Sequence, residues 1–346
     1  MRIMPPLRIL HVFRAPLGGL FRHAIDLARG QVARGHDVGI FCDSTTGGAR
    51  AEAVFAELGP QLTLGVTRVP MSRYPDLTDL KAQIATFRVR GRLQPDVMHA
   101  HGSKGGLYAR LPALFYARRK YITAYTPHGG SFNYKPGTFE HKLYMGVERL
   151  LERATDMFMF ESDYIADRFE EYVGHKPRTD FRVVKNGVSE AEFEPINHSD
   201  ARYDLVYLGE LRSAKGVDTL IEGLAILKHQ HGLAPSILVV GSGPEEEALK
   251  GRASILGVGP QMSFEPPGPI RHALSRARIM VIPSRAESLP YVILEAAAAC
   301  QPLVSTNVGG IPEIYGPAHA HRLIEPNDAA ALAAAMAASL AIKPDE

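Results

Sequence analysis

The chain has only two cysteines among 346 residues, no tryptophan and no long run of hydrophobic residues. Cys42 and Cys300 both lie in apolar segments and have no zinc-type spacing, which argues against a disulfide framework and predicts two core residues in a reducing compartment. No segment approaches about 18 consecutive strongly apolar residues, and the N-terminus lacks the apolar run of a signal peptide. We therefore expect a cytoplasmic protein without an integral membrane segment.

Charge is distributed unevenly along the chain, although the net charge is only +2. The residues up to Tyr125 contain 18 Lys and Arg against 8 Asp and Glu, so the remainder is net negative. Clusters at residues 88–92 and 118–120 contribute much of this surplus, and such clusters can be solvated helix ends or can attract anionic lipid headgroups by about 1 kcal/mol per basic residue. The lipid alternative would place the protein peripherally on the inner face of the membrane. Nucleic acid is not expected as a partner, because the chain has no recognised binding motif and is not strongly basic overall.

The first half of the chain alternates short apolar strands with amphipathic helices. A strand at residues 7–13 leads into a glycine turn that contains Gly18 and Gly19, followed by a helix at residues 20–34 and a strand at residues 37–42. Further strands are expected at residues 62–69, 96–101, 121–126, 156–160 and 182–184, and helices near residues 76–92, 105–117, 138–153 and 163–172. This alternation predicts a doubly wound parallel sheet.

The same pattern of strand, glycine turn and helix starts again at Tyr203. The length of 346 residues and the hydrophobic content of 45% can supply two cores. We therefore expect an α/β protein with two Rossmann-like domains, at residues 1–188 and 203–346, joined by a polar, turn-rich hinge at residues 189–202. The functional cleft is expected between these domains, at the carboxyl ends of the strands.

Two carboxylates bracket the start of a helix in the segment Arg285–Glu295. Pro290 suits a first helical position, so Glu287 would precede the helix and Glu295 would lie little more than a turn into it. The apolar neighbours of Glu295 indicate a buried helix, where a carboxylate needs a polar partner. The segment alone leaves two alternatives open, a core ion pair or the two hydroxyl donors of a sugar or ribose diol.

A second candidate site lies in the turn Gly209–Gly216, between an apolar strand and a helical pattern. Such turns direct backbone N–H groups and the positive end of the helix at a ligand. Arg212 and Lys215 would add a guanidinium and an ammonium, which together suit a diphosphate. The alternative is a pair of solvated surface cations.

Histidines accompany two strand ends in the first half. His99 and His101 end the strand at residues 96–101, but the sequence places no carboxylate or cysteine to complete a metal site, and none is assigned. His128 follows the strand at residues 121–126, and the glycines after it would let a ligand approach the backbone. By itself, a histidine in this position is more often a structural loop residue.

Four motifs in order resemble the retaining glycosyltransferases of family four, which have the two-domain fold called GT-B. They are Gly209 to Gly216, Gly241-Ser-Gly-Pro244, Glu287 to Glu295 and Gly309-Gly-Ile-Pro-Glu313. The resemblance covers nearly the whole chain. It implies a hexosyltransferase that moves a sugar from a nucleoside diphosphate sugar to an acceptor hydroxyl with retention at the anomeric carbon.

The resemblance also implies roles for individual residues. His128 and Glu287 would contact the transferred sugar, Arg212 and Lys215 would stabilise the leaving diphosphate, and Glu295 would hold the ribose diol. The expected donor contacts are Gly18, Gly19, Gly209, Gly241, Gly243, Leu289, Tyr291, Val292 and Glu295. No cofactor or metal is expected, because no Asp-x-Asp motif is present for a metal-bound diphosphate.

The sequence also departs from the family pattern. A Glu-Pro-Pro-Gly-Pro segment at residues 265–269 replaces the usual base-binding loop, which leaves UDP-sugars and GDP-sugars both open as donors. The chain ends soon after an expected helix at residues 328–342, where relatives continue into a helix that crosses back onto the first domain. The acceptor would be a glycan or a lipid-linked saccharide. A catalytically silent nucleotide-sugar-binding subunit and a phosphorylase of the same fold are the alternative functions.

Overall fold

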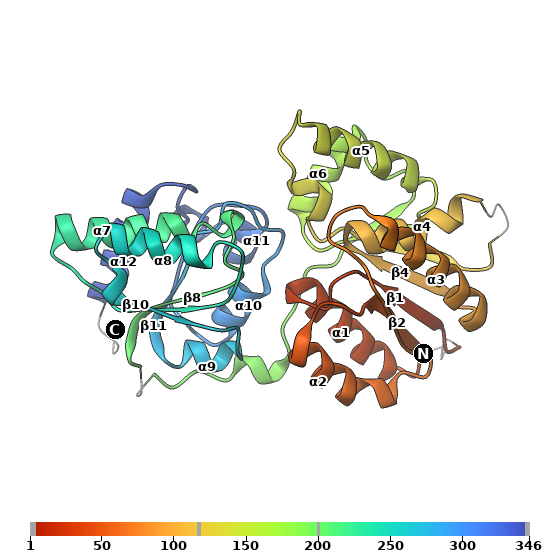
Figure 1. Ribbon diagram of the computed structural model, residues 1–346, viewed down its shortest axis with the longest axis horizontal. Helices are drawn as coiled ribbons and strands as arrows, with labels where there is room; N and C mark the ends of the chain where they lie inside the picture. Colours follow the sequence, from red (N-terminus) through yellow and green to blue (C-terminus); the bar gives the residue numbers. More distant parts are fainter. Residues whose placement is uncertain (1–4, 116–118, 199–200, 343–346) are drawn as a thin grey trace. The chain divides into compact units, whose positions relative to one another are not determined.

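The computed structural model describes residues 5–115, 119–198 and 201–342. The chain divides into two compact units, Met1–Asn186 and Gly187–Glu346 (Figure 1). Each is an α/β unit built on its own parallel sheet, as the alternation of strands and helices predicts.

The N-terminal unit contains a parallel sheet of seven strands among its described residues, in the order β3-β2-β1-β4-β5-β6-β7. This order reverses direction at β1 and β4, where ligands bind in doubly wound folds. The strands are β1 Arg8–Val12, β2 Asp37–Asp43, β3 Gly65–Val69, β4 Val97–His101, β5 Ile122–Thr126, β6 Met157–Phe160 and β7 Asp180–Val183. The helices are α1 Gly18–Val32, α2 Gly48–Leu58, α3 Leu77–Leu93, α4 Gly102–Phe115, α5 Phe139–Glu152 and α6 Asp163–Val173.

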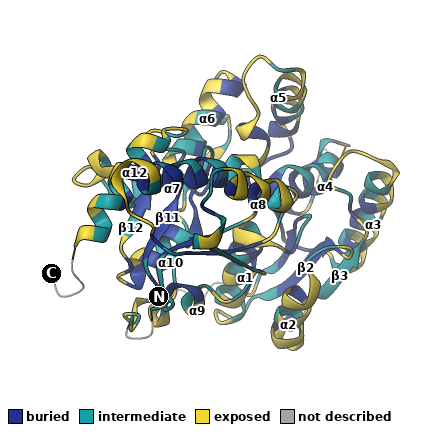
Figure 2. Cartoon of the chain, turned by 60° about the vertical axis from the view of Figure 1, so that its left-hand side comes forward, coloured by how far each residue is buried: buried dark blue, intermediate teal, exposed yellow. Residues whose placement is uncertain are grey.

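Local sequence explains where several of these helices begin. Asp76 forms a capping box with Asp79 at the start of α3, and the hydroxyls of Thr138 and Ser162 cap α5 and α6. Two hydrophobic clusters cover the two faces of the sheet, one under α1 and α2 and the other under α3 to α6. The central strands β1, β2, β4 and β5 are almost entirely buried between these clusters, whereas the edge strands β3 and β7 are partly exposed (Figure 2).

The C-terminal unit contains a parallel sheet of five strands among its described residues, in the order β10-β9-β8-β11-β12. The strands are β8 Tyr203–Leu208, β9 Ile237–Val240, β10 Met262–Glu265, β11 Ala277–Ile282 and β12 Leu303–Ser305. The helices are α7 Val217–His231, α8 Glu246–Ile255, α9 Ile270–Leu274, α10 Tyr291–Ala298, α11 Ile311–Tyr315 and α12 Ala329–Ala341. Leu205 and Tyr207 pack in the cluster with α7 and α12, whereas Val206 and Leu208 pack in the cluster with α9 and α10, so both faces of β8 are covered.

The described part of the segment predicted as a hinge, residues 189–198 and 201–202, packs within the C-terminal unit, while residues 199 and 200 lie outside the described residues. A 3₁₀ turn occupies Glu190–Phe193, and the Arg271 guanidinium donates to the carbonyl oxygens of Glu192 and Glu194. The amide of Ile196 donates to the carbonyl of Ala299. The last described helix, α12, packs on α7 within the same unit.

Two details of the sequence analysis are wrong. Cys42 is buried as expected, but Cys300 is exposed, because it follows the end of α10 in a left-handed turn with φ 57°. Pro290 is the N-cap and not the first helical residue, since its ψ of 122° is extended and α10 begins at Tyr291.

Candidate functional site

The turn between β8 and α7 is shaped by a close approach of two backbones. Arg212 precedes a 3₁₀ turn, Ser213–Lys215, which ends at Gly216 with φ +66°. A Cβ on Gly216 would lie 2.0 Å from the carbonyl oxygen of Pro283, so only glycine allows the turn to pack against the end of β11. This packing brings Lys215 to the loop that precedes α10.

Lys215 and Glu287 form an ion pair that joins two of the predicted site motifs. Lys215 Nζ lies 2.6 Å from Glu287 Oε1, and the Ser284 hydroxyl donates to the same oxygen at 2.7 Å. Glu287 is only 8% exposed, so it needs these partners as a buried carboxylate. A ligand with an anionic group next to a hydrogen-bond donor, such as a hydroxyl, would suit this pair of side chains.

Arg212 is held much more loosely. Its Nε lies 2.7 Å from Glu210 Oε2, and the two side chains are 37% and 45% exposed. Exposed pairs of this kind contribute about 0–1 kcal/mol, so a phosphate can replace Glu210 as the partner at little cost. The turn thus presents one cation in an exposed pair, Arg212, and one in a largely buried pair, Lys215.

Arg285 holds the turn in place, a role that the sequence analysis did not assign. Its guanidinium donates to the carbonyl of Ser213 at 2.7 Å, to Asp218 at 2.7 Å and to the hydroxyl of Thr219 at 3.0 Å. The backbone amide of Arg285 donates to the carbonyl oxygen of Ala214. Arg285 is therefore a positioning residue that ties the β8–α7 turn to the loop after β11.

The predicted donor-binding glycines lie where this turn packs against the β9–α8 loop. A Cβ on Gly241 would lie 1.9 Å from the carbonyl oxygen of Gly209, and a Cβ on Gly243 would lie 2.2 Å from that of Leu211. The amide of Leu211 also donates to the carbonyl of Ser242. This close packing requires glycine at positions 241 and 243 whether or not a ligand is bound.

Helix α10 presents a first turn without a side-chain cap. Leu289 and Tyr291 are 5% and 7% exposed, which limits their side chains to the interior, whereas Val292 is half-buried. Glu295 is also half-buried, so the expected buried helix is buried on one side only. The N-terminal amides of such a helix are suited to an anion.

The N-terminal unit offers a similar helix start. Helix α1 begins at Gly18 with φ +63°, and its N-cap, Leu17, provides no side-chain cap. Gly18 and Gly19 are exposed. Both predicted residues therefore lie at an uncapped helix N-terminus, which suits an anionic group.

His128 lies beside this helix in a cluster of five histidines from neighbouring elements. His11 on β1 is in register with His99 on β4, and His101 and Thr126 are partners at the ends of β4 and β5. His128 follows β5 in a left-handed conformation with φ 56°. His23 comes from α1, and its ring centroid lies 4.7 Å from that of His128.

Hydrogen bonds order this cluster. His11 Nε2 lies 2.8 Å from Gln31 Oε1, His11 Nδ1 lies 2.9 Å from His101 Nε2, and His101 Nδ1 lies 3.1 Å from His128 Nε2. Burial lowers the pKa of His11 and of His23 to about 4 and holds the pKa values of the other three rings well below 6.5. The rings are therefore neutral at neutral pH, and His128 can contact a ligand by hydrogen bonding but not as a cation.

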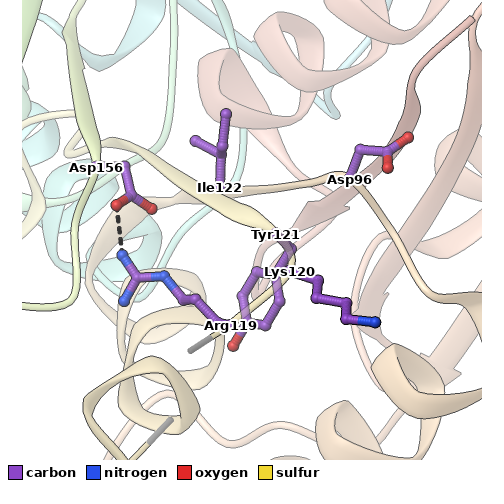
Figure 3. Close-up of a pocket in the computed structure, with 6 residues that line it drawn as sticks. All are labelled: Asp96, Arg119, Lys120, Tyr121, Ile122 and Asp156. Carbon is purple, nitrogen blue, oxygen red and sulfur yellow. Dashed lines mark hydrogen bonds and ion pairs between the residues drawn. The ribbon is translucent and has the colours of Figure 1, made fainter. Parts of the chain in front are cut away.

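A pocket at the opposite, amino end of the same sheet contains part of the basic cluster at residues 118–120 (Figure 3). It is lined by Asp96, Arg119, Lys120, Tyr121, Ile122 and Asp156. Arg119 is paired with Asp156 at 2.5 Å, and Lys120 is exposed, while Arg118 lies outside the described residues. Because ligands of doubly wound folds bind at the carboxyl ends of the strands, this pocket is not a candidate for the donor.

Comparison with known proteins gives two family matches that together cover most of the chain. Residues 17–192 match the family described as Glycosyltransferase Family 4, and residues 188–345 match the family described as Glycosyl transferases group 1. The chain is 27% identical over 348 residues to the glycogen synthase of Mycobacterium tuberculosis, with 92% of this chain and 82% of the relative covered. It is 29% identical to a putative colanic acid biosynthesis glycosyltransferase of Escherichia coli, with 80% and 68% covered.

Solved structures show the same fold. The sucrose-phosphate synthase of Thermosynechococcus elongatus has a TM-score of 0.75 at 20% identity, over 96% of this chain and 89% of that one. WaaG, a glycosyltransferase involved in lipopolysaccharide biosynthesis, has a TM-score of 0.68 at 17% identity, over 97% of this chain and 91% of that one. The expected GT-B fold is confirmed. Within the part of the chain that the structure describes, every helix is too short or too polar to cross a membrane.

Proposed function

The chain belongs to glycosyltransferase family 4, and we propose that it moves a hexosyl group from a nucleoside diphosphate sugar to an acceptor hydroxyl, with retention at the anomeric carbon and without a divalent metal. The observation that carries this proposal is the contact of 2.6 Å between Lys215 and Glu287. A cation and a hydroxyl acceptor this close match the point where the diphosphate of such a donor meets its sugar.

Charge on the leaving diphosphate is the main obstacle to the reaction. Arg212 and Lys215 would stabilise that charge together with the uncapped first turns of α1 and α10. Removing one such contact typically lowers the rate by about 10²–10³. These groups belong to the protein, so the proposal needs no metal to neutralise the leaving group.

Three side chains would hold the rest of the donor. Glu287 would accept hydrogen bonds from sugar hydroxyls, and Glu295 would accept those of the ribose diol. His128, being neutral, would bond to the sugar from the N-terminal unit. Glu287 is already bound by Lys215 and Ser284, which makes it a poor nucleophile. We therefore assign no covalent intermediate, and the departing phosphate oxygen takes the proton of the acceptor hydroxyl on the same face of the sugar.

The acceptor is proposed to be a saccharide on an anionic membrane surface. Support comes from the names of relatives in teichuronic acid and colanic acid biosynthesis and from the charge of the N-terminal unit, whose residues 1–186 contain 27 Lys and Arg against 18 Asp and Glu. One outer face of α5 combines Phe139, Leu143 and Leu150, which are 75%, 52% and 49% exposed, with exposed Lys142 and Arg153. Apolar residues mixed with cations on one helix face suit the lipid interface.

A donor panel tests the proposal most directly. The purified chain is titrated calorimetrically with UDP- and GDP-sugars, and the donor that binds is then tested for transfer to saccharide acceptors and for slow hydrolysis. We expect one nucleotide to bind, with affinity lost in Arg212→Ala, and transfer that persists in the presence of a chelator. Binding without transfer or hydrolysis would favour the catalytically silent subunit, and binding of neither nucleotide would exclude both functions for UDP- and GDP-sugars.

A further inference from the structure

Three histidines from separate elements of the N-terminal unit converge on one point. His23 on α1, His101 at the end of β4 and His128 after β5 each provide a ring nitrogen, and these three atoms lie within 4.8 Å of one another. Neutral imidazoles are among the preferred ligands of Zn²⁺, Co²⁺, Ni²⁺ and Cu²⁺.

Neighbouring groups fix the tautomers of two of these rings. His23 Nδ1 lies 3.0 Å from Asn186 Oδ1, so Nδ1 carries the proton and Nε2 the lone pair. His101 Nε2 lies 2.9 Å from His11 Nδ1, and His11 in turn donates from Nε2 to Gln31 Oε1 at 2.8 Å. His11 therefore accepts from His101, which leaves the lone pair of His101 on Nδ1. Outer partners of this kind orient the ligands of histidine metal sites.

The spacing of the third ring also fits a metal. His101 Nδ1 and His128 Nε2 are 3.1 Å apart. Two nitrogens bound to one tetrahedral Zn²⁺ at about 2.0–2.1 Å lie roughly 3.3 Å apart, so the metal would need only a small separation of these rings. The shared proton would move to His128 Nδ1, and both facing nitrogens would then present lone pairs to the ion.

We propose that His23, His101 and His128 bind a divalent transition metal of the Zn²⁺ class, with a fourth position open to water or another ligand. A second triad, His11, His99 and His101, also brings three ring nitrogens within 4.8 Å of one another, but all three residues are buried. The His23 triad is favoured because it includes the half-buried His128 and is therefore less enclosed than the second triad.

The consequence for catalysis rests on the proposed function. Because Nε2 of His128 faces His101, a metal on Nε2 places a positive charge next to the ring that is proposed to contact the transferred sugar, and we expect it to inhibit transfer. The metal is then an inhibitor and not a participant in the reaction. Mg²⁺ should have no such effect, because it prefers oxygen ligands.

The test is a titration of the chelator-treated full chain with Zn²⁺ by calorimetry, in the absence of donor, and with Co²⁺ by visible absorption. We expect one Zn²⁺ per chain and a Co²⁺ spectrum of nitrogen ligation at low coordination number. His23→Gln and His128→Gln should each weaken Zn²⁺ binding by at least about 10²-fold, beyond the 10–100-fold typical of outer partners. Two control variants leave the proposed ligands in place. His99→Gln changes the second triad, and His231→Gln changes an exposed histidine of the C-terminal unit. Both variants should retain Zn²⁺ affinity within about threefold, since neither residue is a ligand of the proposed site.

Circular dichroism and the melting temperature establish whether each variant is folded. Because His23 and His128 lie in different elements, one variant can still test the proposal if the other fails to fold. Unchanged Zn²⁺ affinity in both His23→Gln and His128→Gln would overturn the proposal. Loss of Zn²⁺ affinity in His99→Gln together with unchanged affinity in His23→Gln would also overturn the proposal, because it would place the ion in the second triad. Zn²⁺ binding by a chain that performs no transfer would leave the metal site standing and remove the proposed function instead.

Discussion

Replacing Lys215 with methionine should reveal two separate roles of the pair that it forms with Glu287, one in stability and one in donor binding. The side chains of Lys215 and Glu287 are 20% and 9% exposed, and their charged atoms are 2.6 Å apart. Breaking a fully buried pair costs about 3–5 kcal/mol, because a charge is left without its partner. Here Lys215 keeps some solvent contact and Ser284 still donates to Glu287, so we expect a loss of about 1–3 kcal/mol.

Thermal unfolding measures this loss. For a unit of this size, 1 kcal/mol corresponds to about 2–4 °C in melting temperature, so Lys215→Met should lower the melting temperature of the C-terminal unit by roughly 2–12 °C. The double variant Lys215→Met/Glu287→Gln should recover most of the difference, since a neutral amide needs no counter-ion. Arg212→Ala is the matched control, and its exposed pair predicts a change within about 0.5 kcal/mol.

Transfer should follow a different pattern from stability. Arg212→Ala and Lys215→Met should each lose about 10²–10³ in rate at a temperature where both are folded, because each removes one contact to the leaving diphosphate. The stability rescue in the double variant should not restore transfer. Equal destabilisation by Arg212→Ala and Lys215→Met, or a double variant no more stable than Lys215→Met, would refute the reasoning.

Four further predictions follow from other parts of the chain. Glu295→Gln should weaken calorimetric binding of the free nucleoside diphosphate, whereas Glu287→Gln should lower turnover more than nucleotide affinity; equal loss of affinity in both would contradict the assigned roles. Transfer should survive EDTA, and activity that stops with chelator and returns with Mg²⁺ or Mn²⁺ would count against leaving-group stabilisation by the protein alone. Arg110→Met should destabilise the N-terminal unit by about 3–5 kcal/mol in calorimetric unfolding, because it removes the fully buried partner that lies 2.8 Å from Glu148. The control variant Arg29→Met, at an exposed pair, should change the free energy of unfolding by no more than about 0.5 kcal/mol. The chain should sediment with anionic but not zwitterionic liposomes at low salt, less so in the Arg88→Ser/Arg92→Ser variant, and indifference to lipid charge would favour a soluble acceptor.

The fold was predictable because its signals are local. Most strands of the parallel sheets are short apolar runs followed by a helix, so their approximate positions follow from periodicity. The edge strand β7, with the sequence Asp-Phe-Arg-Val, is an exception. Cys300 shows the limit of that reasoning. Its neighbours Ala296 and Ala299 are buried, but the chain turns into a left-handed conformation at Cys300 itself and exposes the thiol.

The contact between Lys215 and Glu287 was only partly predictable. Both residues follow neighbouring parallel strands, β8 and β11, and this topology places them at the same edge of the sheet. Sequence therefore favoured a shared site. It did not indicate that the two side chains contact each other, because that depends on the close approach of Gly216 to Pro283, which only the folded backbone shows.

The histidine cluster marks the harder case, since its members carry different amounts of signal. His101 ends β4 and His128 follows β5, and these two strands pair, so the proximity of the two residues follows once the strands are placed side by side. His11 could have been found by placing β1 beside β4, where it is in register with His99. His23 has no such signal, because it lies in the middle of an amphipathic helix and its periodicity assigns it to the core like any apolar residue. A histidine in that position becomes informative only after the helix has been docked on the sheet, and the missing ligand of a site built on strand ends should therefore be sought on the helix that follows the first strand.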